Sequence, residues 1–361
     1  MRGPHGSPSG SLQVGEVRRA AGVPPRRLGT ERRPALELSI DTMSRMNTEP
    51  EPLLAASDLV ATLEAYRTCE FATIGRDGTP MAWPTSGIAC GDGTFLLTTS
   101  LGYPQKAYNV RRDARVALLF SDPTASGLTS AEQILVRGDA VCPDEVHTDP
   151  VGDLGVFWHR IFERQPESRR YLDWPLTKLT DFYFLRLLIR ITPTDVTSRP
   201  LPATETAAAG TTFAGTELVG ADVLASYPSV VLTARNRAGA VVMARTTVVP
   251  VEGGYRVAVP DGLAVSEGPA SLLVHRHDDN LSKLHNASLR GMLAADGDEW
   301  LLRPERLVEP GARNRAGLAD PLRILRDCRA TTRRYLERRG LERPQVPWPA
   351  YRAIRAAVNG H

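Results

Sequence analysis

The strongest constraint on the fold of this chain is a pattern of short alternating segments, punctuated by glycine turns, that occurs twice. The segment YRTCEFATIGRDGTPMAWPTSGIACGDGTFLL can be laid over YPSVVLTARNRAGAVVMARTTVVPVEGGYRVA without a gap, which places Gly78 on Gly239 and Gly93 on Gly254. Alternating apolar and polar residues are typical of half-buried strands, and Asp-Gly is typical of hairpin turns. The repeat therefore predicts an internal duplication of a small antiparallel β-barrel. A coincidental match of glycine-punctuated strands is the alternative.

A second pair of matching residues extends the repeat. Arg137-Gly138, in the strand-like segment EQILVRGDAVCP, finds a counterpart in Arg290-Gly291 once the loop before it is shortened. We therefore expect a mainly β protein with added helices and two related barrels. Its expected parts are a disordered N-terminal extension at 1–48, a first barrel at 49–200, a second and degenerate barrel at 201–310, and a helical tail at 311–361.

Helical spacing is confined to a few segments. Apolar residues recur with this spacing in EPLLAASDLVATLEAYRTC, which predicts an amphipathic helix before the first strand. The segment YPQKAYNVRRDA is short and polar enough for one helix or turn between strands. The tail predicts one helix, a proline-broken middle at 344–349 and a shorter second helix.

The composition narrows the class of protein. The sequence has 361 residues, 42% of them hydrophobic, and a formal net charge of +3 with mixed signs along the chain, so it predicts no nucleic-acid or membrane partner. Four widely separated cysteines indicate reduced thiols and a cytoplasmic protein. The longest apolar run, FYFLRLLIRI, is interrupted by Arg186 and Arg190 and is too short to span a membrane.

The first 45 residues are rich in Gly, Pro, Ser and Arg and lack a sustained apolar period, a composition that predicts disorder. The alternative is that translation starts at Met43 or Met46. In that case the extension is not part of the protein.

A candidate anion site lies in LLTTSLGYPQKAYNVRRDARVALLF. Lys106 is one of three lysines in an arginine-rich chain, and it follows a strand that ends in Thr98, Thr99 and Ser100. A lysine offers a compact charge with three donors, and hydroxyls at a strand end add further hydrogen bonds to an anion's oxygens. The pattern indicates a phosphate site, and a solvated surface lysine is the alternative.

Four pieces in this order, FATIGRDGTPMAWP, GDGTFLLTTS, QKAYNVRRDARVALLFSD and ILVRGDAV, resemble the pyridoxamine 5'-phosphate oxidase-like family of flavin-binding split barrels. DFYFLRLLIRITPTDV looks like the closing strand of the same domain. The resemblance implies that each barrel is a split β-barrel and that the cofactor is flavin mononucleotide, FMN.

The same resemblance implies particular site residues. The phosphate would be bound by Lys106, Thr99 and Ser100, with Asn109 bracing them, and the flavin ring would be bordered by Trp83, Pro84 and Thr85. Many relatives carry an aromatic residue where Ser86 stands here, so we expect an open pocket on that side. Trp83 as a residue of the barrel core is an alternative to its role beside the ring.

The second half departs from the family pattern. Its segment DGLAVSEGPA replaces SLGYPQKAYNVRRDAR and has no lysine or asparagine, so we expect no phosphate site there. Because members of the family usually bind the cofactor at a dimer interface, the second barrel is expected to close the site of the first, as a pseudo-dimer within one chain. A homodimer is the alternative.

The segment VHRHDD offers ligands for a metal site, because His275 and His277 share one strand face and Asp278, Asp279 and His285 are near in sequence. We favour exposed polar residues at a strand end and expect no metal. The resulting functional hypothesis is an FMN-binding oxidoreductase acting on a small molecule. A deazaflavin-dependent reductase, or a non-catalytic protein that binds flavin or haem, is the alternative.

Overall fold

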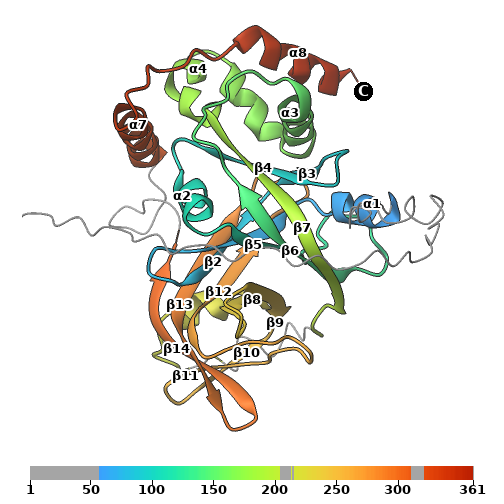
Figure 1. Cartoon of the computed structure of the whole chain (residues 1–361), viewed down its shortest axis with the longest axis vertical. Coiled ribbons are helices and arrows are strands. Elements are labelled where there is room, and N and C mark those ends of the chain that lie inside the picture. The colour runs from blue at the N-terminus through green and yellow to red at the C-terminus, as the bar shows by residue number, and fades with distance from the viewer. Residues whose placement is uncertain (1–56, 204–212, 214, 310–320, 361) are drawn as a thin grey trace, which may run out of the picture. The chain divides into compact units, whose positions relative to one another are not determined.

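Two antiparallel sheets of seven strands each account for most of the secondary structure (Figure 1). The computed structural model describes residues 57–203, 213, 215–309 and 321–360. The extension expected at 1–48 lies outside these residues. The protein is thus mainly β, with helices added between the strands and at the C-terminus, as the sequence predicts.

The first sheet is curled because its two edges are neighbours in sequence. Its strand order is β2-β1-β5-β6-β7-β4-β3, so β2 and β3 form opposite edges although Ser86 alone separates them. A flat sheet of this order could not be connected in this way. The strands are β1 (Cys69–Ile74), β2 (Pro80–Thr85), β3 (Gly87–Ala89), β4 (Phe95–Ser100), β5 (Arg115–Phe120), β6 (Glu132–Val141) and β7 (Arg186–Pro200).

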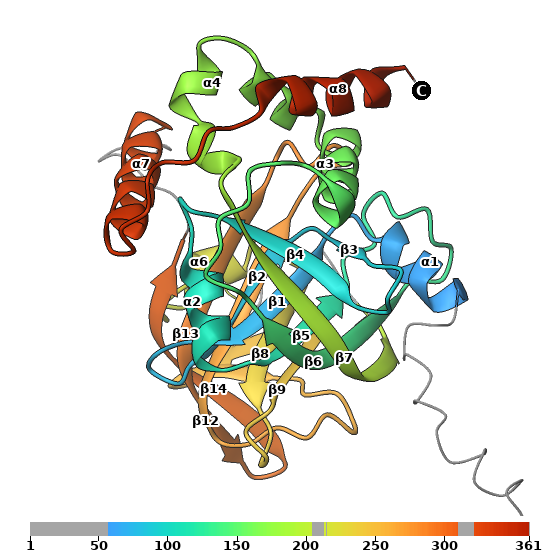
Figure 2. The ribbon, with the colours of Figure 1, turned by 45° about the horizontal axis from the view of Figure 1, so that its top comes forward.

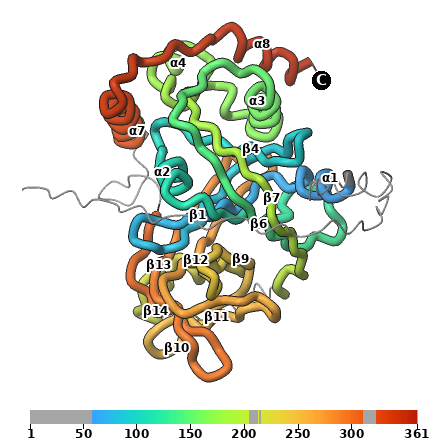
Figure 3. The backbone as a smooth tube through the Cα atoms, in the orientation of Figure 1, coloured from blue at the N-terminus to red at the C-terminus, as the bar shows by residue number. Residues whose placement is uncertain are grey.

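The second sheet repeats this topology strand for strand. Read from the other edge, its order is β9-β8-β12-β13-β14-β11-β10, and each strand stands seven places after its counterpart in the first sheet. Figure 3 shows these strands in yellow and orange. They are β8 (Val230–Arg235), β9 (Val241–Thr246), β10 (Val248–Val251), β11 (Gly254–Val257), β12 (Gly268–Arg276), β13 (His285–Asp296) and β14 (Glu299–Val308).

The first glycine turn of each half has the register that the sequence predicts. Gly78 has φ 84° in the β1–β2 turn and Gly239 has φ 76° in the β8–β9 turn, a backbone conformation that favours glycine. In the second pair of turns the left-handed residue is Gly93 in the first half but Gly253 in the other, and Gly254 begins β11. The gap-free alignment, which pairs Gly93 with Gly254, is therefore wrong by one residue at that turn.

The two Arg-Gly pairs mark a β-bulge at the same place in both sheets. The register between β6 and β7 shifts at Arg137/Gly138, and the register between β13 and β14 shifts at Arg290/Gly291. A Cβ at Gly138 would stand 2.4 Å from a backbone carbonyl oxygen of the neighbouring strand, and one at Gly291 would stand 2.1 Å from its equivalent. Glycine is required at both bulges because the backbones approach too closely for any side chain.

Each sheet encloses its own apolar core, and a third core joins them. The joining core contains Ala72, Ile74 and Leu119 from the first sheet and Val231, Met243 and Leu273 from the second. The polar contacts at this interface are specific. Gln133 on β6 accepts a hydrogen bond from the backbone of Arg245 at 2.7 Å and donates one to its carbonyl at 3.0 Å.

Helices cover the first sheet. α2 (Gln105–Arg112) packs against β1, β6 and β7 (Figure 2). α3 (Gly152–Arg164) lies beside the C-terminal helix α8 (Trp348–Asn359) and near β3 (Figure 1). The remaining helices are α1 (Ser57–Ala65), α4 (Leu176–Leu179), α6 (Ala221–Leu224), α7 (Pro321–Glu337) and the 3-10 turns Pro166–Leu172 and Asp181–Tyr183.

The helical predictions are confirmed where the structure describes the chain. The segment around Lys106 forms α2, and the tail forms a longer helix followed by a shorter one. The closing strand begins at Arg186, because Asp181–Tyr183 make a 3-10 turn before it. Within the described residues, no helix is long and apolar enough to cross a membrane.

Candidate functional site

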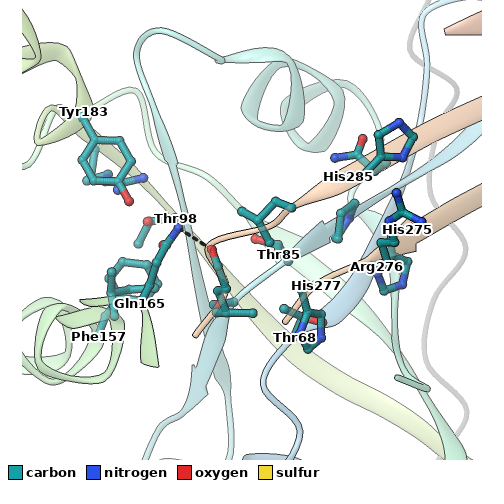
Figure 4. A pocket seen from close by; sticks show the side chains of 17 residues that line it. Thr68, Thr85, Thr98, Phe157, Gln165, Tyr183, His275, Arg276, His277 and His285 are labelled. Carbon is teal, nitrogen blue, oxygen red and sulfur yellow. Dashed lines mark hydrogen bonds between the residues drawn. The ribbon is translucent and has the colours of Figure 1, made fainter. Parts of the chain in front are cut away.

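A cavity of about 210 Å³ lies between the two sheets (Figure 4). Its wall on the side of the first barrel comes from the end of β2, from β4, from α3 and from the start of β7. Its opposite wall comes from the end of β12, the start of β13 and the loop between them. Both halves of the chain are therefore needed to form it.

The end of β2 supplies the residues that the sequence assigns to the flavin ring. Pro84 and Thr85 line the cavity, and so does Ser86 at the bend into β3. Trp83 does not line it. Its half-buried indole borders a neighbouring surface hollow together with Gln105 and Arg290, so it is not part of the barrel core.

At the end of β4, the hydroxyl that lines the cavity is not one of the two that the resemblance assigns to the phosphate, Thr99 and Ser100. Thr98 lines the cavity, and its Oγ1 is buried without a hydrogen-bond partner among the described residues. Thr99 Oγ1 donates to the carbonyl of Tyr103 at 2.6 Å, and Ser100 Oγ accepts from the amide of Gly102 at 3.0 Å. These two hydroxyls therefore shape the turn before α2.

Lys106 is a cation without an acidic partner. No salt bridge or hydrogen bond of its Nζ is present in the described part of the chain, and its closest aromatic neighbour is Trp83, with Nζ 6.0 Å from the ring centroid. Burial, reinforced by the nearby charge of Arg186, lowers the pKa of Lys106 to about 8. Lys106 is not among the residues that line the cavity, but it is close enough to Arg186 for the two charges to interact.

Asn109 fixes the helix that carries this lysine. Its side chain is fully buried, and Nδ2 donates to Thr73 Oγ1 on β1 at 2.8 Å. Its Oδ1 accepts from Gln105 Nε2 and Arg112 Nη2, both at 2.8 Å. This is a bracing arrangement, because each bond ties α2 either to itself or to the first strand.

Arg186, the first residue of β7, lines the cavity and has no acidic partner among the described residues. The residue is 6% exposed, and its guanidinium lies 4.4 Å from the ring centroid of Tyr183 and 4.7 Å from that of Trp158. Its Nε has no hydrogen-bond partner among the described residues. Burial lowers the pKa of Arg186. A buried cation packed against aromatic rings gains free energy when it binds an anion, because its charge is otherwise poorly solvated.

The wall contributed by the second barrel is built from the VHRHDD segment. His275, Arg276 and His277 line the cavity, together with His285 and Asn286 on the next strand. The favoured interpretation of this segment as exposed polar residues is wrong for its histidines, since His275 is 5% exposed and His277 is 8% exposed. They are buried because the end of β12 faces the first barrel.

A buried charge network lies behind this wall. Glu70 on β1 is fully buried, with Oε1 2.6 Å from His275 Nε2 and 2.8 Å from Arg245 Nη2. Burial acts to raise the pKa of the Glu70 carboxyl, but His275 and Arg245 hold it below its usual value. Asp122 lies 3.7 Å from His275 Nδ1 and 3.5 Å from His277 Nε2. The network crosses the interface, because Glu70 and Asp122 belong to the first half and the cations to the second.

The charge of the cavity lining is one-sided. Its 17 lining residues include two arginines and three histidines, whereas none of these described residues is an aspartate or a glutamate. Among the described residues, no group of three or more His, Cys, Asp or Glu side chains could hold a metal ion. The arrangement suits an anionic ligand.

Because the two sheets share one topology, the position in the second half that corresponds to Pro84 beside the cavity can be identified. The strand registers put Arg245 at the position of Pro84, and His275 at the position of Ser121. Arg245 Nε donates to Ser121 Oγ at 2.9 Å, so its side chain fills the region where the first half leaves the space beside Pro84. The gap-free alignment of the two halves ends before Ser121 and His275, so the sequence offered no signal for His275.

No protein-family model matches the chain, and no curated protein matches it. Among solved structures, a candidate pyridoxamine 5'-phosphate oxidase from Listeria innocua is 17% identical over 39% of this chain and 94% of that protein, with a TM-score of 0.26. The heme storage protein HutZ from Vibrio cholerae is 12% identical over 39% and 91%, with a TM-score of 0.27. An F420 reductase is 21% identical over 36% and 88%, with a TM-score of 0.23. At these values the matches assign neither a family nor an activity.

Proposed function

We propose that this protein is an FMN-binding oxidoreductase that acts on a small molecule in the cavity between its two barrels. The observation that carries the proposal is Arg186, a buried cation that lines one end of that cavity without an acidic partner in the described residues, with the half-buried Lys106 nearby. A buried cation without an acidic partner is costly, so a site that keeps one is built for an anion.

The residues present fit the phosphate of FMN. Arg186 can offer a planar fork, Lys106 a compact charge and Thr98 a hydroxyl whose Oγ1 lacks a partner within the described chain. In this proposal Thr99, Ser100 and Asn109 support the site indirectly by fixing the turn and the helix. The polar groups that contact the phosphate are then Arg186 and Thr98, and Lys106 adds a nearby positive charge.

The ring-binding part of the proposal rests on the end of β2. Pro84 and Thr85 present a rigid, partly apolar edge to the cavity, on which a flat ring can lie. The bound flavin would supply the hydride or electron transfer, and the chain would supply binding, orientation and exclusion of water. A hydrogen bond between the two walls favours exclusion of water. Gln165, the residue after α3, donates from Nε2 to the carbonyl of Leu281 at 3.2 Å.

Two alternatives remain as proposals from the same geometry. A deazaflavin coenzyme also carries a phosphate and would use the same two cations. A haem-binding function is favoured by the three histidines that line the cavity, His275, His277 and His285. Against it, His275 Nε2 is bound to Glu70, and His285 Nδ1 is bound to the hydroxyl of Tyr227.

The first test is the absorbance and fluorescence spectrum of the purified protein, followed by mass spectrometry of any small molecule released by heat. FMN supports the proposal, and deazaflavin or haem supports the corresponding alternative. A protein that carries no cofactor and binds none of the three when they are added contradicts all of them.

A variant locates the cofactor. Lys106→Ala should release FMN while the far-ultraviolet circular dichroism of the protein stays unchanged. Lys178→Ala, which removes the lysine of α4, serves as the matched control and should retain the cofactor. Binding of FMN by Lys106→Ala with the affinity of the original protein would refute the site.

A further inference from the structure

We propose that the wall contributed by the second barrel is an oxyanion subsite, so that the small-molecule substrate is an organic acid whose charged group binds Arg276. This inference rests on the proposed function, because it names the substrate class of the same cavity. It concerns a second anion, distinct from the phosphate at the other end.

Arg276 is an exposed arginine that lines the cavity and has no acidic partner among the described residues. Its guanidinium lies 5.6 Å from the ring centroid of Tyr227, and no salt bridge of Arg276 occurs within the described residues. The Tyr227 hydroxyl is in turn hydrogen-bonded to His285 Nδ1, and His285 is the cross-strand neighbour of Arg276. The guanidinium is therefore positioned on a packed aromatic support, which reduces the entropy lost when it binds a ligand.

His277 adds a second polar group to this wall. Its Nδ1 lies 3.0 Å from the carbonyl of Asp278, and its buried Nε2 makes no hydrogen bond among the described residues but lies 3.5 Å from the Asp122 carboxylate. The nearest carboxylates, Asp122 and Glu70, do not line the cavity and lie behind the histidines. A ligand in the cavity consequently meets cations and imidazoles first.

The two anion-binding ends are separated in space. In Figure 4, Tyr183, against which Arg186 stacks, lies on one side of Thr85, and Arg276, His275 and His285 lie on the other. The ring expected to lie against Pro84 and Thr85 would thus have the cofactor phosphate at one end and the substrate's charged group at the other. A neutral or cationic substrate would leave Arg276 unpaired in this wall.

Three small probes test the charge requirement on the protein with its cofactor bound. Isothermal titration with benzoate, phenyl phosphate and the neutral analogue benzamide should show binding of at least one anion and at least tenfold weaker binding of benzamide. The better of the two anions tells whether the subsite prefers a carboxylate or a phosphate. Equal affinity for benzamide and both anions would overturn the proposal.

A pair of arginine variants locates the subsite. Arg276→Ala should weaken binding of the preferred anion by about 10- to 100-fold, the range expected for loss of a hydrogen bond to a charged group. Arg237→Ala, which removes an exposed arginine from the β8–β9 turn, is the matched control and should bind as the original protein does. Unchanged binding by Arg276→Ala, or equal loss in Arg237→Ala, would overturn the proposal.

The two proposals fail in different ways. Arg276→Ala and the more conservative Arg276→Gln should keep the visible spectrum of the cofactor and the melting temperature, because only the substrate wall is changed. If the original protein binds no flavin at all, the proposed function fails, whereas anion binding that depends on Arg276 can still be measured in the protein without cofactor. If flavin binds and no anion does, the subsite alone is refuted.

Discussion

At the scale of single residues, the proposed site contains two cations, Lys106 and Arg186, that have no acidic partner among the described residues. Lys106 shows the consequence most directly, because burial and the charge of Arg186 lower the pKa of its ammonium to about 8. A lysine with its ordinary pKa would stay charged throughout the physiological range. This one loses its proton close to that range unless an anion binds.

The first prediction follows from this pKa. A bound phosphate favours the charged lysine, so FMN binding above pH 8 must be accompanied by proton uptake, and below that pH it need not be. The association constant should therefore be nearly flat from pH 7 to 7.5, above the second ionisation of the phosphate, and fall by up to about tenfold per pH unit above pH 8. Fluorescence titration of the cofactor across this range measures it.

Lys106→Arg is the control for that titration, because an arginine stays charged at all these pH values. Its affinity for FMN should show no decrease near pH 8. The same decrease in both proteins would assign the titration to another group.

Glu70 and Arg245 lead to a second prediction at this scale. Glu70 has no exposed surface and is 2.8 Å from Arg245, so Arg245→Met leaves a buried carboxylate with one cation fewer. We expect the free energy of unfolding to fall by about 3–5 kcal/mol, as measured by urea denaturation. The double variant Glu70→Gln/Arg245→Met should recover part of this loss. A double variant no more stable than Arg245→Met would show that the charge is not the cause.

At the scale of elements, the bulges in β6 and β13 position the strands that surround the site. Both occur at an Arg-Gly pair, and both bring the glycine Cα against the neighbouring strand. The bulge bends the strand locally and increases its twist, which lets a seven-stranded sheet curl on itself. The same device in the same strand of each half gives the two barrels similar curvature.

The third prediction compares two glycines of the first barrel. Gly138→Ala places a Cβ 2.4 Å from the carbonyl oxygen of Thr192, and backbone atoms cannot move aside cheaply. The free energy of unfolding should fall by about 2 kcal/mol or more. Gly91→Ala, where nothing lies within 4 Å of the added atom, should change it by no more than about 0.5 kcal/mol. Equal effects would mean that the bulge tolerates a side chain.

The elements were largely predictable from the sequence because their signals are local. Alternation, Gly78 and Gly239 located the hairpins, and helical spacing located α2 and the tail helices. The site was only partly predictable. Pro84 and Thr85 do line a cavity, but the choice between Thr98 and Thr99 depends on which face of β4 meets the cavity, and a strand end alone does not reveal that.

The second wall was missed for a different reason. His275 and His277 are polar residues at a strand end, a position that usually faces water. Their burial results from contact between two segments about two hundred residues apart, such as Glu70 with His275. No local pattern encodes such a contact, so it could come only from pairing the two halves as a unit.

At the scale of the whole molecule, residues 51–361 form one unit in which the two sheets share a core. Met243 from β9 is fully buried in that shared core. Neither barrel can therefore lose its structure without exposing apolar surface on the other.

The fourth prediction concerns this shared core. Met243→Ala should lower the free energy of unfolding by about 2–5 kcal/mol, and both barrels should still unfold in one cooperative transition. Coincident curves from tryptophan fluorescence and circular dichroism in urea would confirm it. Met292→Ala, on a side chain that is 40% exposed, is the control and should have little effect. Two separate transitions in the original protein would show that the barrels are independent.

Pro84 and Arg245 stand at corresponding positions of the two sheets, and their difference bears on which substitutions the protein can accept. In an assembly of two identical chains, every substitution appears on both sides of the symmetry axis, so a residue that improves one wall is imposed on the other. Here one strand keeps a proline beside an open cavity while its counterpart carries an arginine that fills the space. Because the two halves belong to one chain, this symmetry constraint does not apply, and a substitution at either of these two positions leaves the other unchanged.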